Sequence, residues 1–418
     1  MTTTPIPWWK EPTRAQWAAF AAAWVGWVLD AFDFTIYLVV GPLIAAEFDV
    51  SPSALAGSIT LTLLVRLFGG WVAGWMADRW GRKLPLMLSL FWFAAFDAAI
   101  FFAPTFAWVL LLRTLFGFGM GAEWTAGTAM AMESFPARSR KIASGLLQAG
   151  WPIGFLLAAG TAYFVVPAFG WRAMFLLAAL PALIVVPIRL FVPNHIPGAD
   201  APAEHAKTRL ADLWVPSVRK MIVLGSLVMA LGFIVYYGLT ANYVLMLMKD
   251  HALAYPSAFL HFVVFNIGML VGVIAAGWVA NRWGVIVALA APALLMVPAL
   301  ALYCGFVPGG LWIGAFLGGA LGVGYSGVTP VLTTSLFPGH VRARAIGVVY
   351  HAGALLAAFT PWVTTELVAH TSLDLSTAIA IICGAGLVAM SAAVIALRRQ
   401  IVSPAQRLRL VADDKLAA

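Results

Sequence analysis

The sequence predicts an all-α membrane protein in which twelve transmembrane helices form two six-helix halves. Its 418 residues are 62% hydrophobic and only 10% charged, whereas a soluble chain carries about 25% charged residues. Twelve apolar runs reach the length of about 20 residues that a membrane helix needs. A motif that begins at Gly74 returns in weakened form at Gly277. Such a composition cannot cover a water-facing surface, so the main solvent must be lipid.

The twelve predicted spans account for most of the chain. They are 15–45, 53–77, 84–103, 106–132, 141–166, 171–191, 219–248, 256–280, 285–304, 311–336, 344–369 and 375–398. Most connections between them are short and rich in Pro, Gly or charged residues, as loops are. We therefore expect a first half at 1–191, a cytoplasmic linker at 192–218, a second half at 219–398 and a cytoplasmic tail at 399–418.

The basic residues orient these spans. With both termini inside, 21 of the 25 Lys and Arg residues fall in cytoplasmic segments or at their edges, and only Arg172 and Lys249 fall outside. Positive charge favours the cytoplasmic side. We therefore expect a multi-pass protein of the plasma membrane (the inner membrane of a bacterium) with both termini cytoplasmic. The net charge of +8 has the same explanation, so we expect no nucleic-acid partner.

The internal repeat covers more than one motif. Gly74–Lys83 has the pattern G-x-x-x-D-R-x-G-R-K, and a degraded copy lies 203 positions later at Gly277–Gly284. Pro136–Arg140 likewise matches Pro338–Arg342 at an offset of 202. Two parallel six-helix repeats are typical of transporters, which place the substrate site between the halves near the bilayer midplane. The repeat therefore favours transport as the function.

Four motifs carry a family resemblance. They are Gly74–Lys83, the R-x-x-x-G-x-G-x-G run that starts at Arg113, the loop Glu133–Arg140, and Trp171–Phe175 at the start of the sixth span. Together they resemble the signature motifs of the major facilitator superfamily. The resemblance implies the major facilitator fold and a secondary transporter that works by alternating access, not an enzyme.

A finer resemblance concerns the substrate. The segments Trp27–Phe34, Arg66–Gly70 and Gly119–Trp124 are similar to those of the sialate and lactate proton symporters. Aromatic-acid symporters carry a related Asp-Gly-Phe-Asp where this chain has Asp-Ala-Phe-Asp, and the seventh span lacks the pattern of fungal lactate permeases. The resemblance implies a proton symporter of a small organic anion. Sialate-like or lactate-like monocarboxylates come first and aromatic acids second.

Six charged residues stand out because they lie well inside predicted spans, namely Asp30, Asp33, Arg66, Asp97, Arg113 and Glu123. A charge near the bilayer centre costs about 2.5–3.5 kcal/mol on insertion scales, so each needs a partner or a function. Counting about 1.5 Å of rise per helical residue places Asp30 and Asp97 near the depth of Arg113 and Asp33 one turn shallower. The same count places Arg66 deeper, near Glu123. We expect Asp97 to form a static ion pair.

An aspartate beside an arginine can couple a proton to an anion. Burial favours the neutral carboxyl group, whereas a neighbouring arginine favours its charged form. A substrate anion that competes for the arginine would free the carboxylate to take a proton. We expect Asp30, Asp33 or Glu123 to take that proton. Arg66 or Arg113 would bind the substrate carboxylate, and in related sugar symporters an acid in the first span faces the arginine of the fourth.

The second half offers neutral polar residues instead. The candidates are Tyr236, Tyr237, Asn242, His261, Asn266, Tyr350 and His351, with Gln148 of the fifth span as a weaker one. Hydroxyl, amide and imidazole groups suit the hydroxyl or keto groups of an organic acid. Of these residues we expect Tyr236, Tyr237, Asn242, Asn266 and His351 to bind substrate. Hydrogen bonding between helices is the alternative for each.

The motif at Gly74–Lys83 lies at the cytoplasmic edge of the membrane. In the superfamily that it resembles, its acid caps a neighbouring helix and latches the halves when the carrier faces outward. The resemblance assigns this latch to Gly74, Asp78, Arg79, Gly81, Arg82, Glu133 and Arg140. The second copy has Asn281 in place of Asp78, so we expect it to be a relic.

Other functions remain as alternatives. Gly150–Gly154 partly matches the Gly-Pro motif of antiporters, which leaves a proton-driven efflux antiporter. A nutrient sensor that does not transport would share the fold. The chain has no context for nucleotide binding and no metal-ligand cluster, and Cys304 and Cys383 share no redox spacing. We therefore expect no cofactor and no metal, and we expect a monomer.

Overall fold

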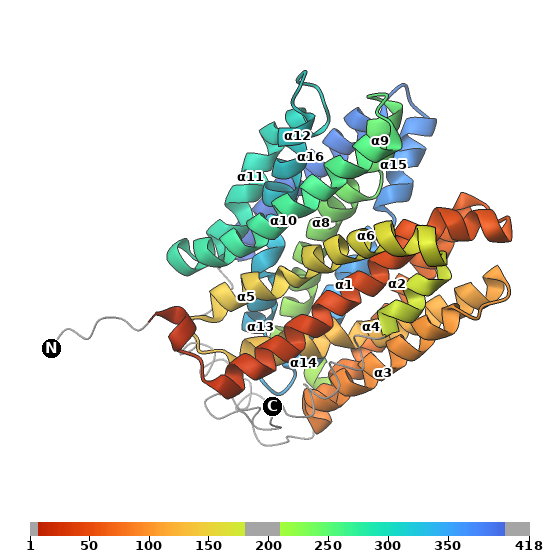
Figure 1. Cartoon of the computed structure of the whole chain (residues 1–418). Helices are drawn as coiled ribbons and strands as arrows, with labels where there is room; N and C mark the ends of the chain where they lie inside the picture. Colours follow the sequence, from red (N-terminus) through yellow and green to blue (C-terminus); the bar gives the residue numbers. More distant parts are fainter. Residues whose placement is uncertain (1–6, 180–209, 398–418) are drawn as a thin grey trace.

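The computed structural model describes residues 7–179 and 210–397, and both ranges are dominated by helices (Figure 1). Neither range contains a β-strand. Eleven helical segments of these ranges are long and apolar enough to span a bilayer, so the predicted all-α membrane fold is confirmed. The predicted span 171–191 is described as helix over 172–179 only. Its remainder, most of the predicted linker and the tail 399–418 lie outside the described residues.

The described elements follow the two predicted halves. The first half contains η1 (Trp8–Lys10), α1 (Arg14–Phe48), α2 (Pro52–Trp80), α3 (Lys83–Ile100), α4 (Phe106–Ser134), α5 (Arg140–Gln148) and α6 (Gly150–Phe169). The second contains η2 (Leu210–Trp214), α8 (Pro216–Thr240), α9 (Tyr243–Lys249), α10 (Tyr255–Trp283), α11 (Val285–Tyr303), α12 (Leu311–Leu317), η3 (Gly318–Val323), η4 (Gly324–Val328), α13 (Thr329–Leu336), α14 (Arg342–Ala357), α15 (Thr360–Ala369) and α16 (Leu375–Leu397). Helix α8 starts inside the predicted linker, because proline suits the first turn of a helix.

Local sequence determines where several helices begin and end, including the turn that the two repeats share. Helix α1 begins with a capping box, in which Gln16 N–H donates to the Thr13 hydroxyl and Thr13 N–H donates to the Gln16 side chain. Such a pair satisfies two backbone donors at the helix start. Helix α2 ends at Gly81 with a φ of 90°, and α10 ends at Gly284 with a φ of 93°. Positive φ favours glycine, so the motif glycine sets the same sharp helix end in both copies.

Four predicted spans are interrupted helices rather than continuous ones. The fifth, seventh and eleventh each divide into two helices, and the tenth passes through a π-helix (η3) and a 3₁₀-helix (η4). The glycines of the tenth span explain its break. A side chain at Gly324 would come within 2.9 Å of the Gly272 Cα atom on α10, so the backbones approach more closely than side chains permit. Breaks of this kind are frequent at functional sites.

Two close helix contacts join the halves. In the first seam, α2 packs on α14, and a Cβ atom at Gly74 would lie 2.7 Å from the Arg344 Cα atom. In the second seam, α5 packs on α10 and η4, and a Cβ atom at Gly277 would lie 2.9 Å from the Lys141 carbonyl oxygen. Figure 1 shows α5 beside α13 where the halves meet. Equivalent glycines of the two repeats thus form equivalent seams.

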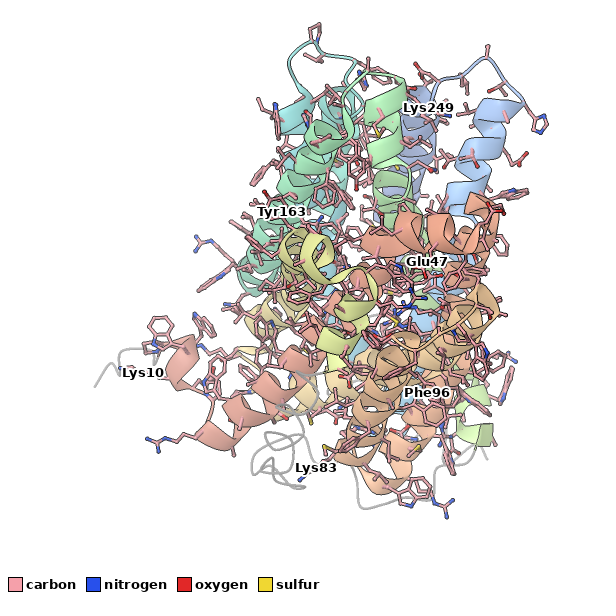
Figure 2. The ribbon with its side chains drawn as sticks, turned by 45° about the vertical axis from the view of Figure 1, so that its right-hand side comes forward. Lys10, Glu47, Lys83, Phe96, Tyr163 and Lys249 are labelled. Carbon is pink, nitrogen blue, oxygen red and sulfur yellow. The ribbon has the colours of Figure 1, made fainter. Side chains whose placement is uncertain are left out.

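Lysine residues lie toward both ends of the molecule. Figure 2 shows Lys10 and Lys83 toward one end and Lys249 toward the other. The first two belong to segments predicted to be cytoplasmic, and Lys249 belongs to a segment predicted to be outside. The two groups are therefore separated along the helices, as the charge bias requires.

The glycine contacts inside the first half predict a stability difference. A Cβ atom at Gly121 of α4 would lie 2.8 Å from the backbone carbon of Gly69, whereas a Cβ atom at Gly160 of α6 meets nothing within 4 Å. Backbone cannot move aside as a flexible side chain can, so Gly121→Ala should cost about 2 kcal/mol and lower the melting temperature by roughly 5 °C. Gly160→Ala is the matched control. Equal melting temperatures of the two purified variants would contradict the packing.

Candidate functional site

A cavity lies between the two halves. The space inside it is about 770 Å³ when the part that opens to solvent is included. Eight of its lining residues are aromatic, namely Trp27, Phe34, Trp151, Phe233, Tyr236, Tyr237, Tyr325 and Tyr350. Arg66 is the only charged residue among the described residues that line it. The cavity is therefore an aromatic chamber with one cationic group.

Arg66 is held by a buried carboxylate behind the cavity wall. Its Nη2 atom donates to Asp30 Oδ2 over 3.1 Å, and the side chains are 5% and 0% exposed. The Arg66 Nε group and the second Asp30 oxygen have no hydrogen-bond partner among the described residues. A guanidinium group carries five N–H donors. The arginine is thus neutralised by one aspartate and retains donors for another acceptor.

An aromatic stack positions the other side of the guanidinium group. The Arg66 Cζ atom lies 5.7 Å from the centre of the Tyr350 ring, at cation–π distance. Tyr350 in turn stacks on Trp124, with ring centres 4.2 Å apart. Arg66 and Trp124 belong to the first half, with Trp124 on α4, and Tyr350 belongs to the second half. The cation therefore lies at the junction between the halves.

A second buried ion pair lies within the first half. Arg113 Nη1 donates to Asp97 Oδ1 over 3.1 Å, with the side chains 1% and 0% exposed. The rings of Phe116 and Tyr37 cover the Arg113 guanidinium group at 4.1 and 4.6 Å. This confirms the expected pairing of Asp97. Arg113 is not among the residues that line the cavity. Of the two arginines expected to bind the substrate carboxylate, Arg66 is the one that lies in the cavity wall.

Asp33 lies between the two ion pairs. It is one turn from Asp30 on α1 and interacts electrostatically with Asp97, Asp30 and Arg113. It is fully buried, and neither of its carboxylate oxygens has a hydrogen-bond partner among the described residues. A charged carboxylate without donors is costly in such a place. Asp33 and Asp30 thus remain candidates for the proton.

The depth count was wrong about the partner of Arg66. The structure pairs Arg66 with Asp30, whereas Glu123 accepts a hydrogen bond from Ser89 of α3 over 3.0 Å. Glu123 is 2% exposed and is not among the cavity-lining residues. Helix tilt and rotation decide which side chains meet, and a count of rise per residue contains neither.

Of the neutral candidates, the structure brings the tyrosines and Gln148 to the cavity and leaves the asparagines and histidines elsewhere. Tyr236 and Tyr237 line it. Asn242 donates to the Pro361 carbonyl, Asn266 donates to the Phe262 carbonyl of its own helix, and His261 stacks on Trp312 with ring centres 3.6 Å apart. His351 lies within hydrogen-bond distance of the Gly121 carbonyl and the Thr125 hydroxyl across the first seam. These four side chains have structural partners outside the cavity lining.

The sequence interpretation missed one polar contact that joins the halves in the cavity lining. The Trp151 indole N–H of α6 donates to the Tyr236 hydroxyl of α8 over 3.0 Å. Both residues line the cavity and belong to different halves. One turn further along α6, Phe155 meets Phe262 of α10 edge to face at 4.9 Å. Aromatic residues in an apolar span give no sequence signal of such a role, because lipid and a cavity both accept them.

The predicted latch is a network that crosses the halves. Arg82 contacts Asp78 at 2.5 Å and Glu133 at 3.0 Å. Glu133 also accepts from Arg342 of the second half at 3.1 Å, and Asp78 accepts from the backbone N–H of Arg344. Burial lowers the pKa of Arg82, but the carboxylates of Glu133 and Asp78 more than offset this and raise it above its ordinary value. Arg82 therefore remains charged at neutral pH.

Two residues assigned to the latch lie beside it. Arg79 is exposed and its Cζ atom lies over the rings of Trp75 and Trp80 at 5.8 and 5.5 Å. Arg140 donates to the Phe135 carbonyl of its own loop. Arg342 and Arg344 belong to the matching loop of the second repeat, so the second half supplies the latch partners that the sequence interpretation did not name.

An N-terminal contact lies at the same end of the molecule. Trp8 of η1 meets Trp278 of α10 edge to face, with ring centres 5.8 Å apart. The Ser139 hydroxyl donates to the Trp8 carbonyl over 3.3 Å and also contacts Glu11. The N-terminal turn is thus attached to both halves beside the latch.

Comparison with known proteins agrees with the fold and the motifs. The Major Facilitator Superfamily profile matches residues 23–361. A probable 4-methylmuconolactone transporter from Cupriavidus pinatubonensis is 28% identical over 363 residues, which cover 84% of this chain and 83% of that protein. The sialic acid transporter NanX from Escherichia coli is 25% identical over 380 residues, 88% of this chain and 91% of NanX.

Solved structures show the same architecture. The proton:xylose symporter XylE bound to 6-bromo-6-deoxy-D-glucose superposes with a TM-score of 0.76, over 93% of this chain and 96% of that chain. The sequence identity is 19%, so the likeness concerns the fold. With a family match over most of its length and two halves joined around a cavity, the chain belongs to the Major Facilitator Superfamily.

Proposed function

We propose that the chain is a proton-coupled symporter that carries a small organic carboxylate by alternating access. One observation carries the proposal: within the part of the chain that the structure describes, Arg66 is the only charged residue in the cavity lining, and a buried aspartate neutralises it. A substrate carboxylate can form a bidentate pair with a guanidinium group. An apolar chamber between the halves with one such group suits a small anion better than a cation or a neutral solute.

Coupling follows from the shared arginine. When a substrate carboxylate binds Arg66, Asp30 loses its counter-charge in a place of low dielectric constant. A buried charge that loses its partner is strongly destabilised, and a proton on Asp30 removes that cost. The proton and the anion thus load together and leave the centre of the protein with the same net charge. Asp33, one turn away and without donors, is the second candidate for the proton.

The aromatic walls bear on the choice of acid. Flat rings in the substrate can stack on tryptophan and tyrosine side chains, and such contacts contribute about 0.5–1.5 kcal/mol beyond burial. The relatives named for 4-methylmuconolactone and for sialic acid both support an organic acid. Of the classes indicated by the sequence, the lining favours aromatic or other flat carboxylates over the sialate-like and lactate-like acids placed first.

The latch fits the same cycle. With Glu133, Asp78 and Arg342 engaged, the halves are held together at the end that carries the predicted cytoplasmic loops, which supports an outward-facing state. Rocking of the halves must break this network before the cavity can open inward. We place both termini and the linker 192–218 on that cytoplasmic side of the plasma membrane, and we propose that a single chain suffices.

Two assays separate the alternatives. An efflux antiporter would move substrate against the proton flow, so an inward proton gradient would slow its uptake into proteoliposomes. A sensor would bind substrate but would show no counterflow of labelled acid. The first assay reports direction and the second reports transport, so each alternative has its own outcome.

We expect carboxylate binding to require Arg66. Arg66→Lys keeps the charge but loses the bidentate geometry, and we expect it to weaken benzoate binding about tenfold in calorimetry. Arg66→Gln combined with Asp30→Asn removes both charges together and should abolish binding while the protein still folds. Arg282→Gln, on an exposed arginine over Trp283, is the control. Full benzoate binding in the double variant would disprove the carboxylate site.

We expect proton coupling to require Asp30. In Asp30→Asn we expect the acceleration of uptake by an imposed inward proton gradient to fall at least tenfold, because the residue can no longer gain or lose a proton. Exchange of labelled substrate should remain measurable. The paired measurement is Asp33→Asn, which tests the neighbour under the same gradient. If both variants keep wild-type acceleration, neither aspartate couples the proton.

The latch should show non-additive variants. Glu133→Gln and Arg342→Gln each remove one partner of a pair at 3.1 Å, and each should slow uptake about fivefold, which corresponds to roughly 1 kcal/mol. Because both remove the same contact, the double variant should be no slower than the slower single variant. Arg219→Gln, exposed at the start of α8, serves as the control. Multiplicative effects would show that the two residues act separately.

A further inference from the structure

The cavity has a second polar region that the proposed carboxylate site does not use. Gln148 and Ser326 both line the cavity. The Gln148 side-chain oxygen and the Ser326 hydroxyl oxygen are buried, and neither has a hydrogen-bond partner among the described residues. Gln148 is only 5% exposed. Buried polar groups are nearly always hydrogen-bonded, so two unpaired ones in a cavity wall need an explanation.

The backbone places these two residues near each other. The Ser144 hydroxyl of α5 donates to the Gly327 carbonyl over 2.7 Å and accepts from the Val331 N–H over 3.2 Å. Gln148 lies four residues after Ser144 on the same helix, so it projects from the same face one turn along. Ser326 directly precedes Gly327 at the break in the tenth span. Both unpaired groups therefore belong to the second seam.

Arg66 belongs to the opposite seam. It lies on α2, which packs on α14, and its guanidinium group faces the Tyr350 ring of that helix. The cavity thus has a cation where α2 meets α14, and two unpaired neutral polar groups where α5 meets η4. Aromatic side chains from both halves form much of the remaining walls, together with aliphatic ones. A ligand that spans the cavity can contact both polar regions at once.

We propose that Gln148 and Ser326 form a second substrate subsite, which takes a hydroxyl group on the end of the acid remote from its carboxylate. An amide offers one acceptor and two donors, and a serine hydroxyl both donates and accepts. A substrate hydroxyl also does both, so it pairs with either residue. The subsite rests on the proposed function, because the carboxylate at Arg66 orients the ligand. It makes hydroxylated ring acids better ligands than unsubstituted ones.

The test compares benzoate, 3-hydroxybenzoate and 4-hydroxybenzoate by calorimetry on the purified full-length protein. We expect one hydroxybenzoate to bind about tenfold more tightly than benzoate, as one well-placed hydrogen bond allows. In Gln148→Leu and in Ser326→Ala, the ratio of the benzoate dissociation constant to that of the tighter hydroxybenzoate should fall below about three. The reason is that the substrate hydroxyl loses a hydrogen-bond partner. Ser326→Ala removes a single atom, so it tests the subsite even if Gln148→Leu folds poorly.

Arg66→Lys is the matched control. It should weaken all three acids together and leave their ratio as in the wild type, because it changes the carboxylate end alone. Equal binding of benzoate and both hydroxybenzoates to the wild type would overturn the subsite and leave the carboxylate proposal standing. An unchanged ratio in both Gln148→Leu and Ser326→Ala would do the same. Failure of all three acids to bind would overturn the carboxylate proposal and the subsite with it.

Discussion

The Arg66–Asp30 ion pair is the interaction on which the rest of the cavity depends. Its members are buried in a bundle that lipid surrounds, and removal of either charge would leave the other uncompensated, at about 3–5 kcal/mol for a buried pair. Any ligand that draws Arg66 away must therefore bring a negative charge. Asp30 then needs a compensating positive charge, and a proton is the smallest ion that supplies it. The same constraint that holds the resting structure together thus links the two proposed cargoes.

The latch obeys a different constraint because its partners come from both halves. Its acids, Asp78 and Glu133, come from the first half, while Arg342 and the backbone N–H of Arg344 come from the second. The side chains of its ion pairs are at most 15% exposed, so the pairs are largely shielded from water. In the proposed cycle these pairs break and form again, while the glycine seams set how closely the halves approach. The central pair then binds substrate, and the latch controls opening at the cytoplasmic end.

The fold could be predicted from the sequence because hydropathy and repeated motifs depend on residue type and position alone. The site could be predicted only in part. Asp30, Arg66 and Tyr236 were identified because charged and polar residues are conspicuous in an apolar span. Their partners were not, because pairing depends on helix tilt and rotation. The same limit explains why Asn242 and His351 were expected at the cavity but lie on structural carbonyls.

The two repeats have diverged in charge but not in packing. Asn281 stands where Asp78 would be, yet Gly277 still packs on α5 as Gly74 packs on α14. Close approach of two backbones tolerates no side chain, so the glycines are constrained as long as the halves meet. The proposed latch uses the acid of the first seam, and the second seam has an asparagine at the equivalent position. The first half can then hold the intramembrane charges while the second supplies hydroxyl groups and rings, and this division lets the substrate surface change without disturbing the proton site.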